Sequence, residues 1–198
     1  MSGGRAIVRA THLRWSPEIG KADRGPIPSV SMSDSSSITT DAVQRVTDRL
    51  AHLNHPHRPR WLDDAARTAQ QAADALGVGL GQIAKSIVFR RKPDGVAVLV
   101  VTSGDLRVDE KKVQALVCAE GGKLGRADAD FVKSATGFSI GGVSPLAHAT
   151  PVVTLVDQQL FRFDEIWAAA GHPHAVFRLT PHQLQTLTGA PVHDVTVV

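Results

Sequence analysis

The first stretch of the chain that could do chemistry is residues 83–90, because it places Lys85 among apolar side chains. If these residues form a strand, alternate side chains share one face, and Lys85 lies in a row with Ile83, Ile87 and Phe89. An ammonium group in such a row is costly unless it reaches water or binds an anion. Two interpretations follow: a strand-end lysine that reaches solvent, or a lysine that binds a negatively charged ligand.

A second candidate stretch is a glycine-rich loop, made of Gly141, Gly142, Val143, Ser144 and Pro145. Adjacent glycines permit positive φ angles and leave backbone N–H groups uncovered, and the proline fixes the exit from the loop. Such a loop can present N–H donors to a carbonyl oxygen or to a developing oxyanion. The alternative is a plain connecting loop.

Two side chains near this loop are candidates for catalysis. Ser144 does not stand in the Gly-x-Ser-x-Gly context of a nucleophile elbow, and no partner base can be assigned to it, so we do not predict a serine nucleophile. His148 follows Pro145 by three residues. It could be a general base or a pocket wall, and a surface histidine is the equally weighted alternative.

Composition narrows the class of protein. The formal net charge of the 198 residues is +3, but residues 1–31 carry five basic and two acidic residues, whereas the rest of the chain carries seventeen of each. The neutral remainder predicts no general polyanion binding, so any nucleic acid would be bound through a local patch. DNA is not among the predicted partners. No apolar run approaches the roughly 18 residues of a membrane span. The single cysteine excludes an internal disulfide and fits the reducing cytoplasm.

The chain divides into an N-terminal extension and one domain. Residues 1–38 are rich in Gly, Pro, Ser and Arg without apolar periodicity, which predicts disorder. Met32 directly precedes the serine-rich stretch, so translation of the native protein could begin there. Residues 39–198 are expected to form a single domain.

The expected elements are a mixture of helices and strands. Helices are predicted over residues 40–53, 69–76, 109–117, 128–135 and 181–188, and strands over residues 83–90, 96–101, 151–156, 166–170, 176–179 and 192–198. The turn at residues 92–95 joins the first two strands into a hairpin. The pattern predicts an α+β fold with a curved, mostly antiparallel sheet and short helices around it.

Several motifs, taken in order, resemble the YbaK/ProX family. They are Ile83–Phe89, Arg107–Lys112, Thr136–Pro145 and Phe161–Gly171. The family consists of freestanding aminoacyl-tRNA deacylases that are related to the editing insertion of bacterial prolyl-tRNA synthetases. The resemblance covers residues 40–198 and implies a barrel-like sheet surrounded by short helices.

The resemblance also implies a reaction, which is hydrolysis of the ester between a wrong amino acid and the 3′ end of a tRNA. The family lysine corresponds to Lys85, which would hold the terminal nucleotide, and the family Gly-x-x-x-Pro loop corresponds to Gly141 and Pro145, which would position the aminoacyl carbonyl. No metal or organic cofactor is implied. The implied partners are the aminoacyl-tRNA 3′ end and, as a second candidate, an aminoacyl-tRNA synthetase.

Three further points concern specificity. The apolar row of Ile83, Ile87 and Phe89 could line a small cavity that admits alanine or cysteine. Some alanine-specific relatives carry asparagine directly after the lysine, whereas this chain has Ser86, so alanine specificity is left open. Residues 90–92, Arg-Arg-Lys, are either a local tRNA contact or a solvated hairpin tip.

Two other functions remain open. The first is a non-catalytic module that binds the tRNA 3′ end or a synthetase. The second is an esterase that acts on small aminoacyl compounds without a tRNA body.

Overall fold

The computed structural model describes residues 35–62 and 68–197, with side chains from residue 41 onward. The first helix, α1 (Ser35–His52), begins five residues before the predicted start at Thr40. Residues 35–38, which precede the predicted start of the domain at residue 39, lie within this helix. The remaining predictions about the N-terminal extension, including a start at Met32, concern residues outside the described range.

The other elements follow in chain order. The helices are α2 (Ala69–Leu76), α3 (Glu110–Val117), α4 (Ala129–Thr136) and α5 (Pro181–Thr188), with the short 3₁₀ helices η1 (Leu80–Gln82) and η2 (Gln158–Arg162). The strands are β1 (Arg60–Trp61), β2 (Ile83–Lys92), β3 (Ala97–Ser103), β4 (Arg107–Val108), β5 (Lys123–Arg126), β6 (Val153–Asp157), β7 (Ile166–His172), β8 (Ala175–Leu179), β9 (Val192–His193) and β10 (Thr196–Val197).

Local capping signals fix several helix ends at their predicted positions. The Thr68 side chain accepts a hydrogen bond from the Gln71 backbone N–H and completes the expected capping box of α2. Thr180 caps α5 in the same way, with Pro181 at the first helical position. The C-terminal glycines of α2, α4 and α5 adopt the left-handed conformation, as expected for Gly77, Gly137 and Gly189.

The main sheet has the strand order β1-β8-β7-β2-β3-β6-β9, and β5 pairs with one end of β2. Its pairs are antiparallel except for β2 with β7, β3 with β6 and β6 with β9. The predicted α+β class, the mostly antiparallel sheet and the hairpin of β2 and β3 are confirmed. The described sheet is not closed into a barrel, since β1 and β9 end it without pairing to each other.

The predicted C-terminal strand over residues 192–198 is divided in two. β9 pairs with β6, whereas β10 leaves the main sheet and pairs with β4. Between them Val195 is fully buried, and its carbonyl accepts a hydrogen bond from the Asp109 N–H. These contacts turn the chain toward β4, which a pattern of alternating side chains does not reveal.

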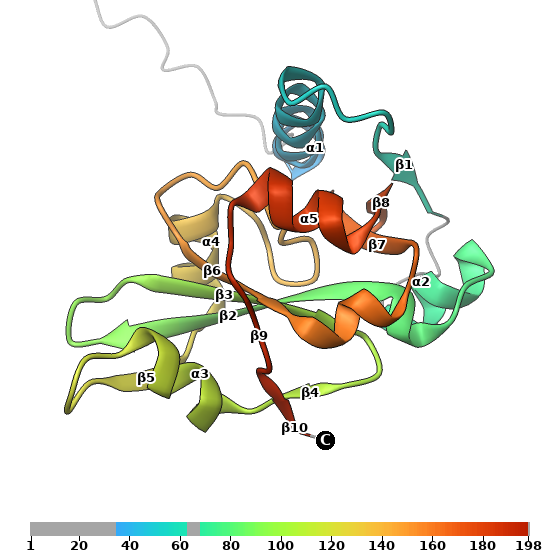
Figure 1. Cartoon of the computed structure of the whole chain (residues 1–198). Helices are drawn as coiled ribbons and strands as arrows, with labels where there is room; N and C mark the ends of the chain where they lie inside the picture. The colour runs from blue at the N-terminus through green and yellow to red at the C-terminus, as the bar shows by residue number, and fades with distance from the viewer. Residues whose placement is uncertain (1–34, 63–67, 198) are drawn as a thin grey trace, which may run out of the picture. The chain divides into compact units, whose positions relative to one another are not determined.

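Strand β3 lies at the centre and packs on both faces. Its side chains Leu99 and Val101 join a core cluster with residues of α1, α4 and α5, while Val98 and Val100 join a second cluster with Val113 of α3. Figure 1 shows this arrangement, with α1, α4 and α5 above the β2–β3 hairpin and α3 with the β4–β10 pair below it. A third cluster packs α2 against the start of β2 and against β7.

Candidate functional site

Lys85 lies near the start of β2, and its ammonium group is half-buried. Its Nζ donates a hydrogen bond of 2.8 Å to the backbone carbonyl of Leu106. Desolvation by burial lowers the pKa of Lys85, and the nearby carboxylate of Asp105 opposes this effect only in part. Among the described residues, no carboxylate comes within ion-pair distance of Nζ. The ammonium is therefore oriented by a neutral acceptor and not by an ion pair.

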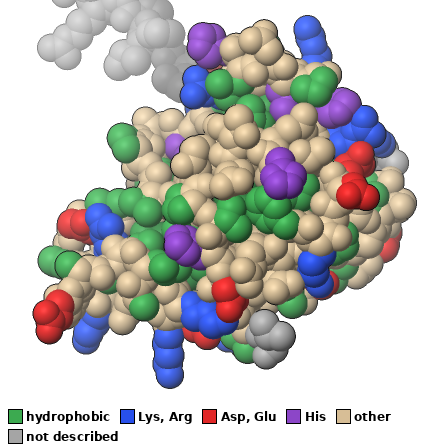
Figure 2. All heavy atoms as spheres, viewed as in Figure 1, with side chains coloured by type: hydrophobic (Ala, Val, Ile, Leu, Met, Phe, Trp, Pro, Cys, Tyr) green, Lys and Arg blue, Asp and Glu red, His purple; other side chains and the backbone are tan. Residues whose placement is uncertain are grey.

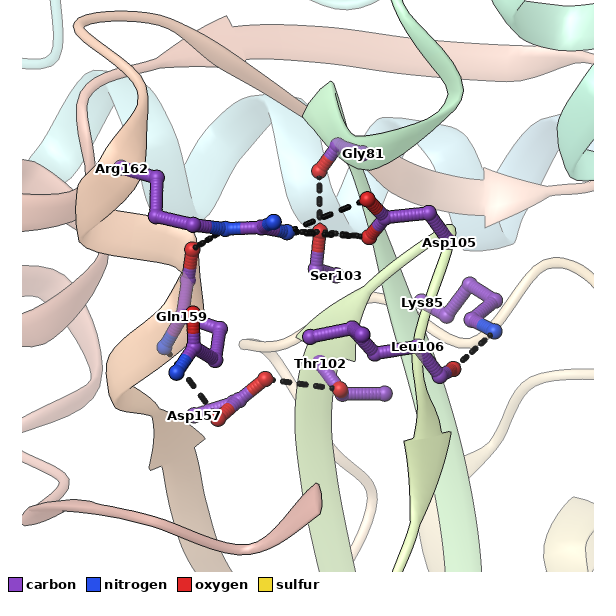
Figure 3. Close-up of polar contacts among 9 residues, drawn as sticks. All are labelled: Gly81, Lys85, Thr102, Ser103, Asp105, Leu106, Asp157, Gln159 and Arg162. Carbon is purple, nitrogen blue, oxygen red and sulfur yellow. Dashed lines mark hydrogen bonds and ion pairs between the residues drawn. The ribbon is translucent and has the colours of Figure 1, made fainter. Parts of the chain in front are cut away.

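The turn that carries the Leu106 carbonyl is held by a polar network, drawn in Figure 3. The Ser103 hydroxyl lies 2.6 Å from the Gly81 carbonyl oxygen and 2.7 Å from a carboxylate oxygen of Asp105. Arg162 donates to Asp105 at 3.0 Å. Burial acts to raise the pKa of Asp105, but the hydrogen bonds from Ser103 and Arg162 outweigh it, so this pKa lies below its usual value. The network fixes the acceptor that orients Lys85.

The glycine loop faces Lys85 across a cavity. Gly141 has a φ of 88°, which an L side chain rarely adopts. Gly142 has no room for a side chain, because a Cβ there would lie 2.7 Å from the Cα of His172. The Gly142 N–H donates to the Ser139 carbonyl at 3.0 Å, so this amide is engaged within the loop. The loop is thus tightly seated against the β7–β8 turn.

Arg45 of α1 holds the two chain segments that precede and follow the glycine loop. Its Nε donates to the Ala147 carbonyl at 3.0 Å, and its Nη2 donates to the Gly137 carbonyl at 3.2 Å. Its guanidinium carbon lies 4.6 Å from the centroid of the Phe138 ring. Ala147 has a positive φ of 61°, an uncommon conformation for alanine that the surrounding contacts must support. Sequence reasoning did not identify Arg45, since its partners lie 92 and 102 positions away.

The cavity between Lys85 and the glycine loop has a volume of about 280 Å³. Five predicted site residues line it: Ile83, Lys85, Ile87, Gly141 and Val143. The structure adds ten lining residues that were not predicted to bind substrate, mainly small or apolar ones, namely Thr68, Ala69, Ala72, Ala84, Ser86, Ile140, Trp167, Ala169, Pro173 and Val176. Five of these, Ala84, Ser86, Ile140, Trp167 and Ala169, fall within motifs that resemble the YbaK/ProX family.

The other predicted site residues lie outside the lining of this cavity. Ser144 is fully buried and Pro145 is buried beside it, while Gly142 packs against the backbone of His172. His148 is half-buried, and its Nε2 donates to the Ser144 carbonyl at 2.8 Å. Desolvation by burial lowers the pKa of His148, so its ring is neutral near pH 7. Gly142, Ser144 and Pro145 therefore form the buried part of the loop, and His148 holds it by a hydrogen bond to its backbone.

Lys85 also lines a second cavity, which has a volume of about 350 Å³. Lys85 and Ile87 line both cavities, whereas Phe89, the last member of the predicted apolar row, lines only the second. Arg107 and Arg126 stand at its edge. The four side chains of the predicted row along β2 therefore all line a cavity, but they are divided between two cavities.

Two buried polar atoms on the lining residues have no hydrogen-bond partner among the described residues. They are the hydroxyl oxygen of Ser86 and the indole nitrogen of Trp167. Within the same part of the chain, no group of three or more His, Cys, Asp or Glu side chains is arranged to hold a metal ion. The helices seen there are all too short or too polar to cross a membrane.

Comparison with known proteins assigns the chain to a family. Residues 63–187 match the sequence model of the aminoacyl-tRNA editing domain, and the chain therefore belongs to that family. This is the YbaK-type domain that the motifs around Lys85 and Gly141 predicted.

Individual relatives agree with this assignment. A protein of Bacillus subtilis (strain 168), YwhH, which has no assigned function, is 34% identical over 151 residues, or 76% of this chain and 94% of its own. A proline–tRNA ligase of Leuconostoc citreum (strain KM20) is 34% identical over 93 residues, which are 47% of this chain but 16% of the ligase. A crystal structure of a candidate trans-editing enzyme for prolyl-tRNA synthetase is 40% identical with a TM-score of 0.73, covering 79% of this chain and 98% of the other.

Proposed function

We propose that the protein is a freestanding trans-editing deacylase, which hydrolyses the ester of a mischarged aminoacyl-tRNA. The observation that carries this proposal is that Lys85 and Gly141, far apart in sequence, line one cavity. An ammonium without an ion-pair partner suits a phosphate or ribose oxygen of the terminal nucleotide. Gly141, which has no side chain, lets the backbone come close to the aminoacyl carbonyl group.

The reaction needs no protein nucleophile. A water oxygen adds to the ester carbonyl carbon, the bond to the 3′ oxygen of the terminal ribose breaks, and that oxygen takes up a proton. The ribose 2′-hydroxyl would assist the attacking water. Ser144 is fully buried and lies outside the cavity lining, which fits a mechanism without an acyl-enzyme intermediate.

The cavity also supports a small amino acid as substrate. Four alanines, Ala69, Ala72, Ala84 and Ala169, line the cavity, and its volume of about 280 Å³ must also leave room for the ester group. Alanine or cysteine attached to the tRNA for proline is the substrate we favour, because the matched ligase and the structural neighbour are both named for proline. A pocket of this kind separates side chains by about 1–3 kcal/mol per methylene.

Three related proposals concern the context of the enzyme. We place it in the cytoplasm, where aminoacyl-tRNA is used, with the tRNA 3′ end as its partner and a prolyl-tRNA synthetase as a second one. We propose that residues 39–198 form a single domain that includes α1, since Val46 and Leu50 of this helix are buried in the main core cluster. We also propose that catalysis needs no metal.

The experiment is deacylation of a panel of charged tRNAs by the full chain, with a chelator present. The panel begins with alanyl-, cysteinyl-, seryl- and prolyl-tRNA for proline. We expect rapid hydrolysis of one mischarged species and little hydrolysis of the prolyl species. Tight binding of tRNA without hydrolysis of any species would overturn the proposal in favour of a binding module, and equal hydrolysis of a free aminoacyl ester would favour a small-molecule esterase.

A further inference from the structure

The entrance of the cavity can be located from the exposure of its lining residues. Trp167 and Val176 are buried on its inner wall, whereas Thr68 and Gly141 are exposed and Ile140 is 60% exposed. The cavity therefore opens between the start of α2 and the glycine loop. Any ligand that is longer than the cavity must leave it past these residues.

An exposed tryptophan stands next to this entrance. Trp61 of the short edge strand β1 is 53% exposed, and its ring centroid lies 5.1 Å from that of His172. The next residue, Pro173, lines the cavity and lies 3.5 Å from the position of a Cβ on Gly141. Contacts thus run without a break from the indole of Trp61 to the entrance. A large aromatic ring left half in solvent is typical of a binding surface.

Positive charge lies on the same edge strand. The guanidinium of the exposed Arg60 stands over the ring of Trp167, with its carbon 5.4 Å from the ring centroid. Arg178, across from Trp167 in the β7–β8 pair, is partly neutralised by Glu165 at 3.1 Å. Figure 2 shows basic and histidine side chains gathered at the upper right of the face in view, where Figure 1 places β1, with acidic side chains just below them.

We infer that Trp61 and Arg60 bind the single-stranded 3′ end of the tRNA, with a base stacked on the indole of Trp61 and a phosphate beside Arg60. The inference rests on the proposed function. The amino acid is joined to the terminal ribose, so an aminoacyl group inside the cavity forces the preceding nucleotides through the entrance and onto this surface. Stacking on an aromatic ring accepts any base and is worth a measurable part of the affinity for single strands.

The chemistry of the surface fits this occupant. Desolvation by burial, together with the nearby His174, lowers the pKa of His172, so its ring is neutral near pH 7 and extends the aromatic surface. A flexible single strand offers both unstacked bases and regularly spaced phosphates, which match an aromatic ring beside a cation. A double-stranded stem would offer only the phosphates.

The test uses the full chain and two uncharged RNA hairpins, one ending in a single-stranded CCA and one blunt. Affinities are measured for the wild type and for Trp61→Ala, Trp61→Phe and Arg60→Ala. Leu116→Ala is the matched control, since Leu116 is 44% exposed on α3 and lines neither cavity. Because the chain has three tryptophans, stacking on Trp61 is read from the difference in fluorescence quenching between the wild type and Trp61→Phe.

We expect Trp61→Ala to weaken binding of the overhang hairpin by roughly 5- to 150-fold, with little effect on the blunt hairpin. Trp61→Phe should retain most of the affinity but lose the quenching. Arg60→Ala should reduce the slope of log affinity against log salt by about 0.7, as expected for one lost phosphate contact to a single strand. Leu116→Ala should bind like the wild type.

Equal binding of the overhang hairpin by the wild type and Trp61→Ala would overturn the inference, as would an equal loss for both hairpins. The two proposals fail separately. Loss of overhang binding in Trp61→Ala, without hydrolysis of any ester by the wild type, would support the surface while removing the deacylase. If Trp61→Ala hydrolyses the ester as fast as the wild type at low substrate concentration, the proposed role of Trp61 is wrong while the deacylase proposal stands.

Discussion

Lys85 and Leu106 are joined by a hydrogen bond of 2.8 Å from the lysine Nζ to the leucine carbonyl oxygen, across 21 positions of sequence. This bond orients the ammonium without neutralising it. The turn that carries the carbonyl is shaped by Gly104, where a Cβ would collide with the Leu80 carbonyl oxygen, and by the pairing of Asp105 with Arg162. The orientation of the Lys85 side chain therefore depends on Gly104, Asp105 and Arg162, which line neither of the two cavities.

The first prediction concerns Arg162, as a positioning residue. Arg162→Met removes the partner of Asp105 and loosens the turn, so we expect the single-turnover deacylation rate to fall about 10-fold while KM changes little. Lys112→Met is the matched control, because it breaks another half-exposed pair, the one with Asp194 at 2.8 Å. Equal rates for the two variants would show that the Arg162 network does not act through Lys85.

The second prediction concerns Arg45 and the glycine loop. Arg45→Met leaves the Gly137 and Ala147 carbonyls without their donor, so the loop loses its anchor on α1. We expect kcat to fall about 10- to 100-fold, because small displacements of a positioning group are costly in rate. Arg49→Met, at an exposed position of the same helix, should leave kcat unchanged. A rise in KM alone would contradict the proposed role of the loop.

The third prediction concerns Gly142. A methyl group there would meet the backbone of His172, which cannot move aside like a side chain. We expect Gly142→Ala to lower the free energy of unfolding by about 1–3 kcal/mol in urea denaturation. Gly79→Ala is the control, because its Cβ would meet only the end of the Gln82 side chain at 3.6 Å. Similar stability of the two variants would place the loop farther from the β7–β8 turn.

The fourth prediction concerns pH. Burial holds the pKa of His148 below that of the unfolded chain, so the unfolded chain binds more protons between the two values. The stability associated with neutral His148 is present above the unfolded value of about 6.5. It is lost as the pH falls through the window below that value. We expect the wild type to lose more stability than His148→Gln between pH 7.5 and pH 5, measured by urea denaturation. An equal loss would mean that His148 titrates normally.

The sequence predicted best what neighbouring residues determine. The ends of α2 and α5 follow from Thr68, Gln71, Thr180 and Pro181, which act within one helical turn, and the class of fold followed from the order of such elements. The short strands β1, β4 and β5 were missed, because a strand of two to four residues exists only through its partner.

The candidate site divides in the same way. Lys85 and Gly141 were found because each is unusual in its own stretch, and the structure places both on one cavity. Trp61, Arg45 and Thr68 were not assigned to the site, since their relation to it arises from contacts between distant segments. The apolar row was predicted from alternation along one strand, but only the folded sheet shows that Phe89 belongs to a different cavity.

The central claim is that the ammonium of Lys85 takes part in ester hydrolysis. Its most direct test is the single-turnover rate of hydrolysis of the mischarged tRNA that the panel identifies, measured for the wild type, Lys85→Ala and the exposed control Lys133→Ala. We predict a loss of at least about 100-fold for Lys85→Ala, with unchanged circular dichroism, and a wild-type rate for Lys133→Ala. An unchanged rate in well-folded Lys85→Ala would contradict the account.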